Sequence, residues 1–236
     1  QIDILTGSML GDGSLHHVNR NKISHYQECH CLKQLGLLEW KREKLLPFSN
    51  EIKIKKTHGR KIENQKVVYD YTKKLDSCYF STISHPFLTD LEKKWYLRDK
   101  NNNYILTNKR RVKIIPNDLI LNERIISVWF FDDGSNNPKN RQAAFNTQSF
   151  SKENCELLVE KLKLFGISCG LVKNRDKLII QTKSSSYLDL IKLVSNHLPH
   201  ACMSYKIDMS NYKVPNYLTR FKSKNQSSLS FCNSTL

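Results

Sequence analysis

The chain has 236 residues, of which 39% are hydrophobic, so it can bury a core in one large domain or in two smaller ones. Its 38 lysine and arginine residues outnumber the 22 aspartate and glutamate residues and give a formal net charge of +16. This surplus favours a polyanionic partner such as a nucleic acid, but it does not distinguish an enzyme from a basic structural protein.

The cysteines and the hydropathy pattern exclude several other classes of protein. The seven cysteines are odd in number and form no C-x-x-C pair, so we expect isolated reduced thiols, with no disulfide framework or zinc site. No run of about 18 apolar residues is present, so no membrane-spanning segment is expected. The sequence also has no signal-peptide pattern, so we do not expect a secreted protein.

The first part of the chain alternates between helical and extended patterns. The apolar run over residues 2–11 predicts a short buried helix that ends at Asp12-Gly13-Ser14. Residues 22–31 alternate weakly and predict a strand. Residues 32–46 then have the apolar spacing of an amphipathic helix, which stops at Pro47, and residues 86–96 predict another helix.

A basic hairpin is expected between these two helices. Residues 51–61 alternate isoleucine with lysine and turn at Gly59, and residues 67–71 have the pattern of a returning strand. The first of these segments carries five cations and one acid, which suits a surface that faces phosphates. A solvated hairpin at the edge of a sheet is the alternative.

The same succession starts again after residue 118. Asn122 suits the N-cap of a helix whose apolar residues 125–131 lead into a second tripeptide, Asp133-Gly134-Ser135. The later elements are predicted as strand 142–148, helix 152–165, strands 167–174 and 177–182, and helix 187–198. The two Asp-Gly-Ser tripeptides, which we call the acidic tips, lie 121 residues apart. The sequence therefore predicts an α+β fold of two repeats, residues 1–118 and 119–236.

The acidic tips indicate chemistry because there are two of them. A single Asp-Gly after an apolar helix is usually a turn, but a two-fold arrangement of the repeats would bring both helices together and both carboxylates to one end. Converging carboxylates repel each other unless divalent cations lie between them, and hard oxygen ligands favour Mg²⁺. Paired metals beside a phosphodiester activate water and stabilise the leaving oxygen.

The two apolar helices are not equally suited to close contact. Gly7 and Gly11 lie four residues apart on one face of the first helix, whereas Val128 and Asp132 occupy the corresponding positions of the second. Because close approach of helices needs small side chains, we expect a helix pair that is splayed or asymmetric.

Residues 5–13 and 126–134 resemble the two motif copies of a single-chain LAGLIDADG homing endonuclease. Through the repeat the resemblance covers essentially the whole chain. It is closest to the yeast mitochondrial omega-intron type, through residues 113–117, 129–134 and 146–150. The resemblance implies two pseudo-symmetric α-β-β-α-β-β-α repeats that form a saddle of antiparallel sheets around a central pair of helices.

The resemblance also assigns roles to individual residues. The expected metal ligands are Asp12 and Asp133, with the backbone carbonyls of Gly11 and Asp132. The residues expected to act on the metal-bound water are Lys113, Lys206, Gln148 and His30. Taken alone, His30 is more typical of a packing histidine, and the two lysines of solvated surface charges.

DNA contacts are expected from the strands, since alternate side chains of a curved sheet reach base edges and phosphates in the major groove. The candidates are Lys53, Lys55, Arg60 and Lys61 in the first repeat, and Arg141, Lys173, Arg175 and Lys177 in the second. Two non-identical repeats in one chain predict a monomer that binds an asymmetric target.

The leading hypothesis is therefore a monomeric, intron-encoded endonuclease that makes a double-strand break at a long specific site in double-stranded DNA. Mg²⁺ is the expected cofactor, with Mn²⁺ substituting and Ca²⁺ supporting binding without cleavage. The alternatives are an intron maturase that binds intron RNA, or a DNA-binding regulator on the same scaffold. Frequent lysine and asparagine suggest an AT-rich genome, which favours a mitochondrion or another organelle.

Overall fold

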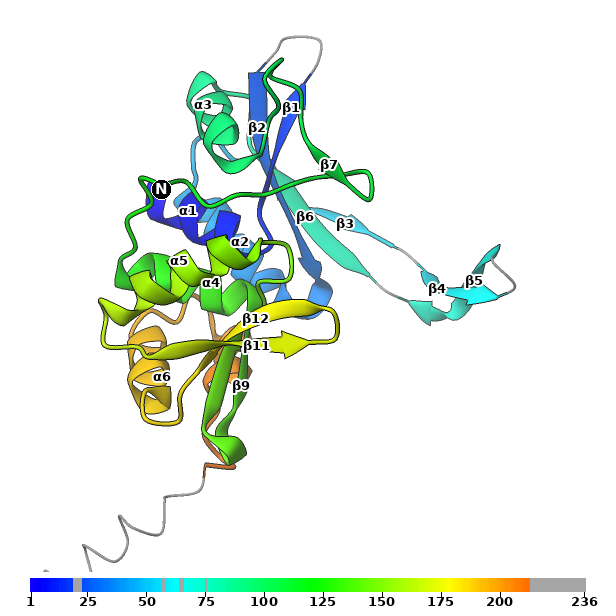
Figure 1. Ribbon diagram of the computed structural model, residues 1–236. Helices are drawn as coiled ribbons and strands as arrows, with labels where there is room; N and C mark the ends of the chain where they lie inside the picture. The colour runs from blue at the N-terminus through cyan, green and yellow to red at the C-terminus, as the bar shows by residue number, and fades with distance from the viewer. Residues whose placement is uncertain (19–22, 57, 64–65, 75, 213–236) are drawn as a thin grey trace, which may run out of the picture.

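The structure is a computed structural model that describes residues 1–18, 23–56, 58–63, 66–74 and 76–212, with backbone alone for 58–63 and 66–74. It contains the same succession of elements twice (Figure 1). The first half comprises α1 (Ile2–Leu10), β1 (Ser14–Val18), β2 (Ile23–Cys31), α2 (Leu35–Lys44), β3 (Lys53–Lys55), β6 (Ser77–Ser81) and α3 (Pro86–Trp95). The second comprises α4 (Glu123–Asp133), β9 (Gly134–Asn137), β10 (Gln142–Phe145), α5 (Lys152–Lys163), β11 (Cys169–Asn174), β12 (Lys177–Thr182) and α6 (Tyr187–Ser195). This order confirms the predicted α+β fold of two α-β-β-α-β-β-α halves.

The two sheets have equivalent topologies. The first has the order β1-β2-β6-β3 and the second the order β9-β10-β12-β11, and neighbouring strands are antiparallel in both. Each sheet thus places its first two strands at one edge and its last two at the other. The pseudo-symmetry inferred from the spacing of the acidic tips extends to the pairing of strands.

The hairpin of β4 (His58–Glu63) and β5 (Lys66–Lys74) is an addition to the first half, between β3 and β6. It extends away from the body of the protein (Figure 1). The predicted turn at Gly59 is wrong, because Gly59 lies within β4 and pairs with Asp70. The isoleucine and lysine alternation indicated extended backbone, but β3 pairs with the distant β6 while β4 pairs with β5.

Local sequence explains where several helices begin. The Asn122 side chain accepts a hydrogen bond from the Ile125 N–H at 2.8 Å and caps α4, as predicted. Ser151 caps α5 in the same way, through the Asn154 N–H. The helix predicted from residue 32 begins at Leu35 instead, after a 3₁₀ turn over Leu32–Gln34. The hydrogen bond from the Leu32 N–H to the Asp76 carbonyl, 3.1 Å long, ties this turn to the start of β6.

Helices α1 and α4 lie side by side at the centre of the molecule. A Cβ atom on Gly7 would lie 2.6 Å from Cβ of Val128, and one on Gly11 would lie 2.5 Å from Cβ of Asp132. The bulky residues of α4 therefore occupy the space left by the glycines of α1. The helix pair is asymmetric, as expected, but it is not splayed at these contacts.

The core is continuous across the two halves. Leu10 of α1, Trp129 and Phe130 of α4 and Phe145 of β10 are buried in it, and the rings of Trp129 and Phe145 stack with centroids 4.0 Å apart. No helix in the described part of the chain is long and apolar enough to cross a membrane.

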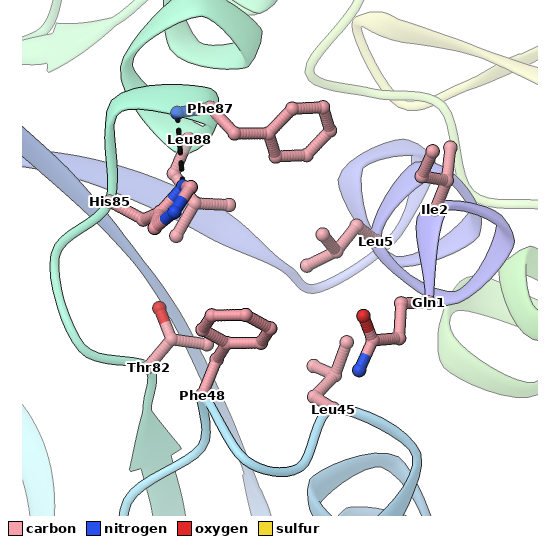
Figure 2. Close-up of a pocket in the computed structure, with 9 residues that line it drawn as sticks. All are labelled: Gln1, Ile2, Leu5, Leu45, Phe48, Thr82, His85, Phe87 and Leu88. Carbon is pink, nitrogen blue, oxygen red and sulfur yellow. Dashed lines mark hydrogen bonds between the residues drawn. The ribbon is translucent and has the colours of Figure 1, made fainter.

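An apolar pocket of about 330 Å³ opens beside the first turn of α1 (Figure 2). Gln1, Ile2 and Leu5 line one side of it, and Phe48 and Leu88 lie among the residues around the rest. The acidic tip follows the last turn of α1, so this pocket lies at the opposite end of the helix.

Candidate active site

The two acidic tips meet at one end of the central helix pair. Because Gly7 faces Val128 and Gly11 faces Asp132, α1 and α4 run in the same direction and end together. Asp12 lies two residues beyond Leu10, the last residue of α1, and Asp133 is the last residue of α4. The side chain of Asp12 is 41% exposed and is accessible to a ligand from solvent.

The electrostatics of the tips suit a divalent cation. Burial, together with the negative charge of Asp12, raises the pKa of Asp133 to about 6. The two carboxylates therefore act on each other, and a bound cation would relieve this repulsion. The donor set is one of hard oxygen atoms, which fits Mg²⁺ better than a softer metal.

Lys113 and Lys206 occupy equivalent places at the ends of the two motif helices. The Lys113 Nζ atom donates to the carbonyls of Met9, Gly11 and Gly13 at 2.9, 3.0 and 2.7 Å. The Lys206 Nζ atom donates to the carbonyl of Asp132 at 2.6 Å. Both ammonium groups thus lie at the negative ends of helix dipoles.

Burial shifts the titration of these lysines. It lowers the pKa of Lys113 to about 8, although the charges of Asp133 and Asp12 oppose this shift, and it also lowers the pKa of Lys206. The carbonyls of Gly11 and Asp132, expected as metal ligands, accept lysine hydrogen bonds in this structure. The side chains of Asp12 and Asp133 are therefore the groups best placed to bind a cation.

His30 lies beside the first tip. It is buried on β2, and its Nδ1 atom is 3.6 Å from Oδ2 of Asp12. Its Nε2 atom is 2.5 Å from Oε1 of Glu28. Burial opposes protonation of the ring, but the hydrogen bond to Glu28 and the charge of that residue raise the pKa of His30 above its ordinary value.

Gln148 lies in a different setting from the one predicted. The expected strand over residues 142–148 ends at Phe145, and Gln148 follows in a turn, where its amide is 3.4 Å from Oδ1 of Asn146. Asn146 itself contacts the second tip, through its Nδ2 atom at 2.6 Å and its backbone N–H at 3.1 Å from the Asp133 carbonyl. These two bonds hold the turn that follows β10 against the end of α4.

A buried ionic cluster behind the tips was missed by the sequence analysis. The Lys41 Nζ atom donates to Ser8 Oγ at 2.7 Å, to Glu28 Oε1 at 2.6 Å and to Asp132 Oδ1 at 2.6 Å. Glu28, His30 and Asp132 have the spacing of metal ligands, but the Lys41 ammonium already bridges the two carboxylates. One signal was available, because Lys41 lies on the apolar face that includes Leu37 and Leu45.

One ammonium does not neutralise two buried carboxylates. Although burial favours its neutral form, the Lys41 ammonium holds the pKa of Glu28 well below its usual range. Burial and the Glu28 charge raise the pKa of Asp132 to about 7. The side chain of Asp132 is therefore part of the cluster and is not directed to a ligand from solvent.

The candidate DNA-binding residues lie on strands and turns of both sheets. Lys53 and Lys55 are exposed on β3, the edge strand of the first sheet. Lys173, Arg175 and Lys177 are exposed on the β11–β12 hairpin, and Arg141 is half-buried in the turn before β10. Arg60 and Lys61 lie on β4, but their side chains are outside the described part of the structure.

The first sheet presents further polar groups that the charge pattern did not reveal. On β2 and β6 the side chains alternate, so that Tyr26, Glu28 and Phe80 are buried while Gln27 and Tyr79 lie on the opposite, more exposed face. Alternation along residues 22–31 was the available signal, and strand pairing was needed to show which face is open.

The raised pKa of Asp133 predicts a stabilising substitution. The pKa of the Asp133 carboxyl is about 6 in the folded protein and ordinarily 3.8. The carboxyl therefore contributes to the stability of the fold fully at a pH below 3.8, and this contribution is lost as the pH rises through about 6. We expect Asp133→Asn to raise the free energy of unfolding of the metal-free protein at pH 7.5 by about 2 kcal/mol.

Thermal melting in a chelating buffer checks this expectation. The difference between the two proteins should shrink at pH 4, where the wild-type carboxyl is largely protonated, and should also shrink when a divalent cation stabilises the wild type. A variant that is less stable at pH 7.5 would show that Asp133 is held by favourable contacts.

Comparison with known proteins gives a consistent result. The sequence profile of the LAGLIDADG DNA endonuclease family matches residues 2–190. The Wickerhamomyces canadensis protein named Probable intron-encoded endonuclease 1 is 28% identical over 216 residues, covering 88% of this chain and 83% of the relative. DNA endonuclease I-ChuI of Chlamydomonas applanata is 25% identical over 228 residues, covering 89% of this chain and 95% of that protein.

A solved structure shares the fold. The structure described as the homing endonuclease I-WcaI bound to its DNA recognition sequence superposes with a TM-score of 0.66 at 24% identity, covering 90% of this chain and 86% of that one. At this identity the likeness establishes the architecture, which is that of two halves around a central helix pair.

Proposed function

This chain belongs to the LAGLIDADG DNA endonuclease family, and we propose that it is a homing endonuclease that makes a double-strand break in a long, asymmetric DNA site. The observation that carries this proposal is the meeting of Asp12 and Asp133 at one end of the paired motif helices, α1 and α4. Two curated relatives of nearly matching length bear the names of endonucleases, which supports the same activity.

Asp12 and Asp133 would hold the divalent cation, with Mg²⁺ as the natural cofactor, Mn²⁺ as a substitute and Ca²⁺ supporting binding alone. When bound, the cation supplies Lewis-acid activation of water and stabilises the leaving oxygen. Lys113 and Lys206, whose ammonium groups lie at the ends of α1 and α4, would place positive charge beside the attacking water and the scissile phosphates. His30, which lies beside Asp12, and Gln148, whose amide contacts Asn146 next to the second tip, would orient water.

The two sheets would bind the DNA. Exposed lysines on β3 and on the β11–β12 hairpin provide phosphate contacts in each half, and the outward side chains of the central strands provide contacts to base edges. The halves differ in sequence, and the first carries the additional β4–β5 hairpin, so the two half-sites of the target would differ as well. We propose a monomer with its repeats divided at residues 118 and 119, in the connection that leads into α4.

The names of its relatives support a proposal about the origin of the protein. Two relatives bear the name of intron-encoded endonucleases, so we propose that this chain is intron-encoded and acts in a mitochondrion or another organelle. Binding of intron RNA, as by a maturase, is the alternative. A side-by-side measurement of affinity for duplex DNA and for structured RNA distinguishes the two.

Selection from a randomised duplex library tests the proposal. In Mg²⁺ we expect the protein to cleave both strands of a small set of related asymmetric sequences, and in Ca²⁺ to retain the same sequences uncut. Nicking rates for the two strands should differ, because the two tips have different surroundings. Absence of cleavage in Mg²⁺ and in Mn²⁺, with tight RNA binding, would contradict the nuclease assignment.

A further inference from the structure

We propose that the buried cluster of Lys41, Glu28 and Asp132 is a positioning device that orients His30 towards the first acidic tip. This inference rests on the proposed nuclease function, since it assigns a role within the same site. It concerns residues whose side chains face inwards, behind the carboxylates that would hold the cation.

The Lys41 side chain has a fixed position. Its side chain is fully buried, and its three ammonium hydrogens are directed to Ser8, Glu28 and Asp132. These partners come from α1, β2 and α4, so one lysine on α2 connects elements of both halves. A long flexible side chain thereby has a single position.

Glu28 connects Lys41 to His30. Lys41 bonds Oε1 of Glu28, and the hydroxyl of Tyr26 bonds Oε2 of the same carboxylate. Held at both oxygens, Glu28 accepts the Nε2–H of His30 through Oε1 at 2.5 Å. This bond fixes the plane of the imidazole, whose Nδ1 atom lies 3.2 Å from Oε1 of Gln34 and 3.6 Å from Oδ2 of Asp12.

Lys41 also contacts α4, the second motif helix. Both carboxylate oxygens of Asp132 bond Lys41, at 2.6 and 2.7 Å, one residue before the ligand Asp133. Gly11 is required for this arrangement, because a Cβ at that position would lie 2.5 Å from Cβ and 3.0 Å from Oδ2 of Asp132. The cluster thus lies between the two helix ends, and it contacts the residues next to each tip.

The second half has no counterpart of this cluster at the described positions that correspond to it, which indicates a role other than general stabilisation of the fold. On α5, the helix of the second half that corresponds to α2, the buried side chains are Cys155, Leu158 and Leu162, none of which is charged. Thr147, in the segment that corresponds to residues 26–30, stands in the place of Glu28 and is neutral. An apolar residue therefore satisfies the packing at this position of the fold, and burying charges in its place costs desolvation energy.

The substitution Glu28→Gln tests the proposal. It keeps the shape of the side chain and leaves Lys41 and Asp132 as a neutral pair, so the protein should still fold. In single-turnover cleavage of a plasmid carrying the selected target, we expect the rate for one strand to fall by about tenfold or more, so that nicked plasmid accumulates. Affinity for the uncut site in Ca²⁺ should stay within about threefold of the wild type.

Two further variants separate positioning from stability. Leu37→Val removes packing on the same face of α2, one turn before Lys41, without changing a charge, and should slow the two strands equally or not at all. The triple variant Lys41→Met, Glu28→Gln, Asp132→Asn removes every charge of the cluster at nearly constant volume, and should fold but keep the strand-selective loss. A triple variant that cleaves both strands at wild-type rates would overturn the proposal.

The experiments distinguish an error in the nuclease function from an error in the positioning role. If the wild type cuts no duplex in Mg²⁺ or Mn²⁺, the nuclease function is wrong. If the wild type cuts its target and Glu28→Gln cuts both strands equally well, or slows both in parallel with Leu37→Val, the nuclease function stands and the positioning role is wrong.

Discussion

Asp12→Asn and Asp133→Asn are each expected to slow cleavage of the DNA target by roughly 10³-fold or more, with little loss of DNA affinity. Asparagine keeps the shape of the side chain but removes the negative charge, and a neutral amide is a poor ligand for a hard divalent cation. Binding should persist, because both substitutions leave unchanged the exposed lysines of β3 and of the β11–β12 hairpin, which we propose as phosphate contacts. It should even strengthen slightly, since a negative charge beside the phosphates is removed.

The measurement is single-turnover cleavage of a labelled duplex in Mg²⁺, combined with affinity for the same duplex in Ca²⁺. Asp3→Asn is a matched control, because Asp3 lies in the first turn of α1, at the opposite end of the helix from Asp12. This control should cleave at close to the wild-type rate. Full cleavage by the double variant Asp12→Asn, Asp133→Asn would remove both acids from the mechanism.

Gly7→Ala is expected to destabilise the protein by about 3 kcal/mol, because the added methyl group overpacks the contact between α1 and α4. The new Cβ would lie 2.6 Å from Cβ of Val128 and 2.8 Å from the carbonyl oxygen of Ile125. Because one of these atoms belongs to the backbone of α4, rotation of a side chain cannot relieve the contact. The helices would have to separate, which would also move the acidic tips apart and reduce cleavage.

Urea unfolding of four proteins checks this expectation through a double-mutant cycle. Val128→Ala alone should cost about 1–2 kcal/mol by leaving a cavity, whereas its combination with Gly7→Ala should recover only the part of the loss caused by the Cγ1 atom of Val128, 2.9 Å from the new methyl group, since alanine keeps the Cβ atom. Gly170→Ala is the control, because no atom lies within 4 Å of the Cβ that it would add. Equal stabilities of Gly7→Ala and Gly170→Ala would show that the central helices are not in close contact.

Much of the fold could be predicted from the sequence because it depends on local patterns. Apolar runs ending in Asp12-Gly13 and Asp133-Gly134 determined where the two motif helices end, and their separation of 121 residues determined the repeat. Asn122 determined the start of α4 through a hydrogen bond from the N–H of Ile125, which lies three residues further along the chain. Each of these signals involves residues that are neighbours along the chain, so the amino-acid order alone is sufficient.

The inner side of the candidate site was decided by tertiary structure. Lys41 acquires its partners from Ser8, Glu28 and Asp132, of which the last is 91 residues away. In the sequence it is one lysine among many in a chain of net charge +16. Its role arises because folding removes it from water, and a buried ammonium must find acceptors wherever the fold supplies them.

The turn at Asn146 and the pairing of β3 with β6 have the same origin. The strand pattern continues to Gln148, but β10 ends at Phe145, and Asn146 donates two hydrogen bonds to the Asp133 carbonyl. Similarly, the alternation over residues 51–61 predicts extended backbone but does not predict which strand pairs with it. The partner of β3 is β6, which follows the inserted β4–β5 hairpin. Local sequence determined which segments are helices and strands, whereas contacts between distant segments determined which polar groups are buried together and face the acidic tips.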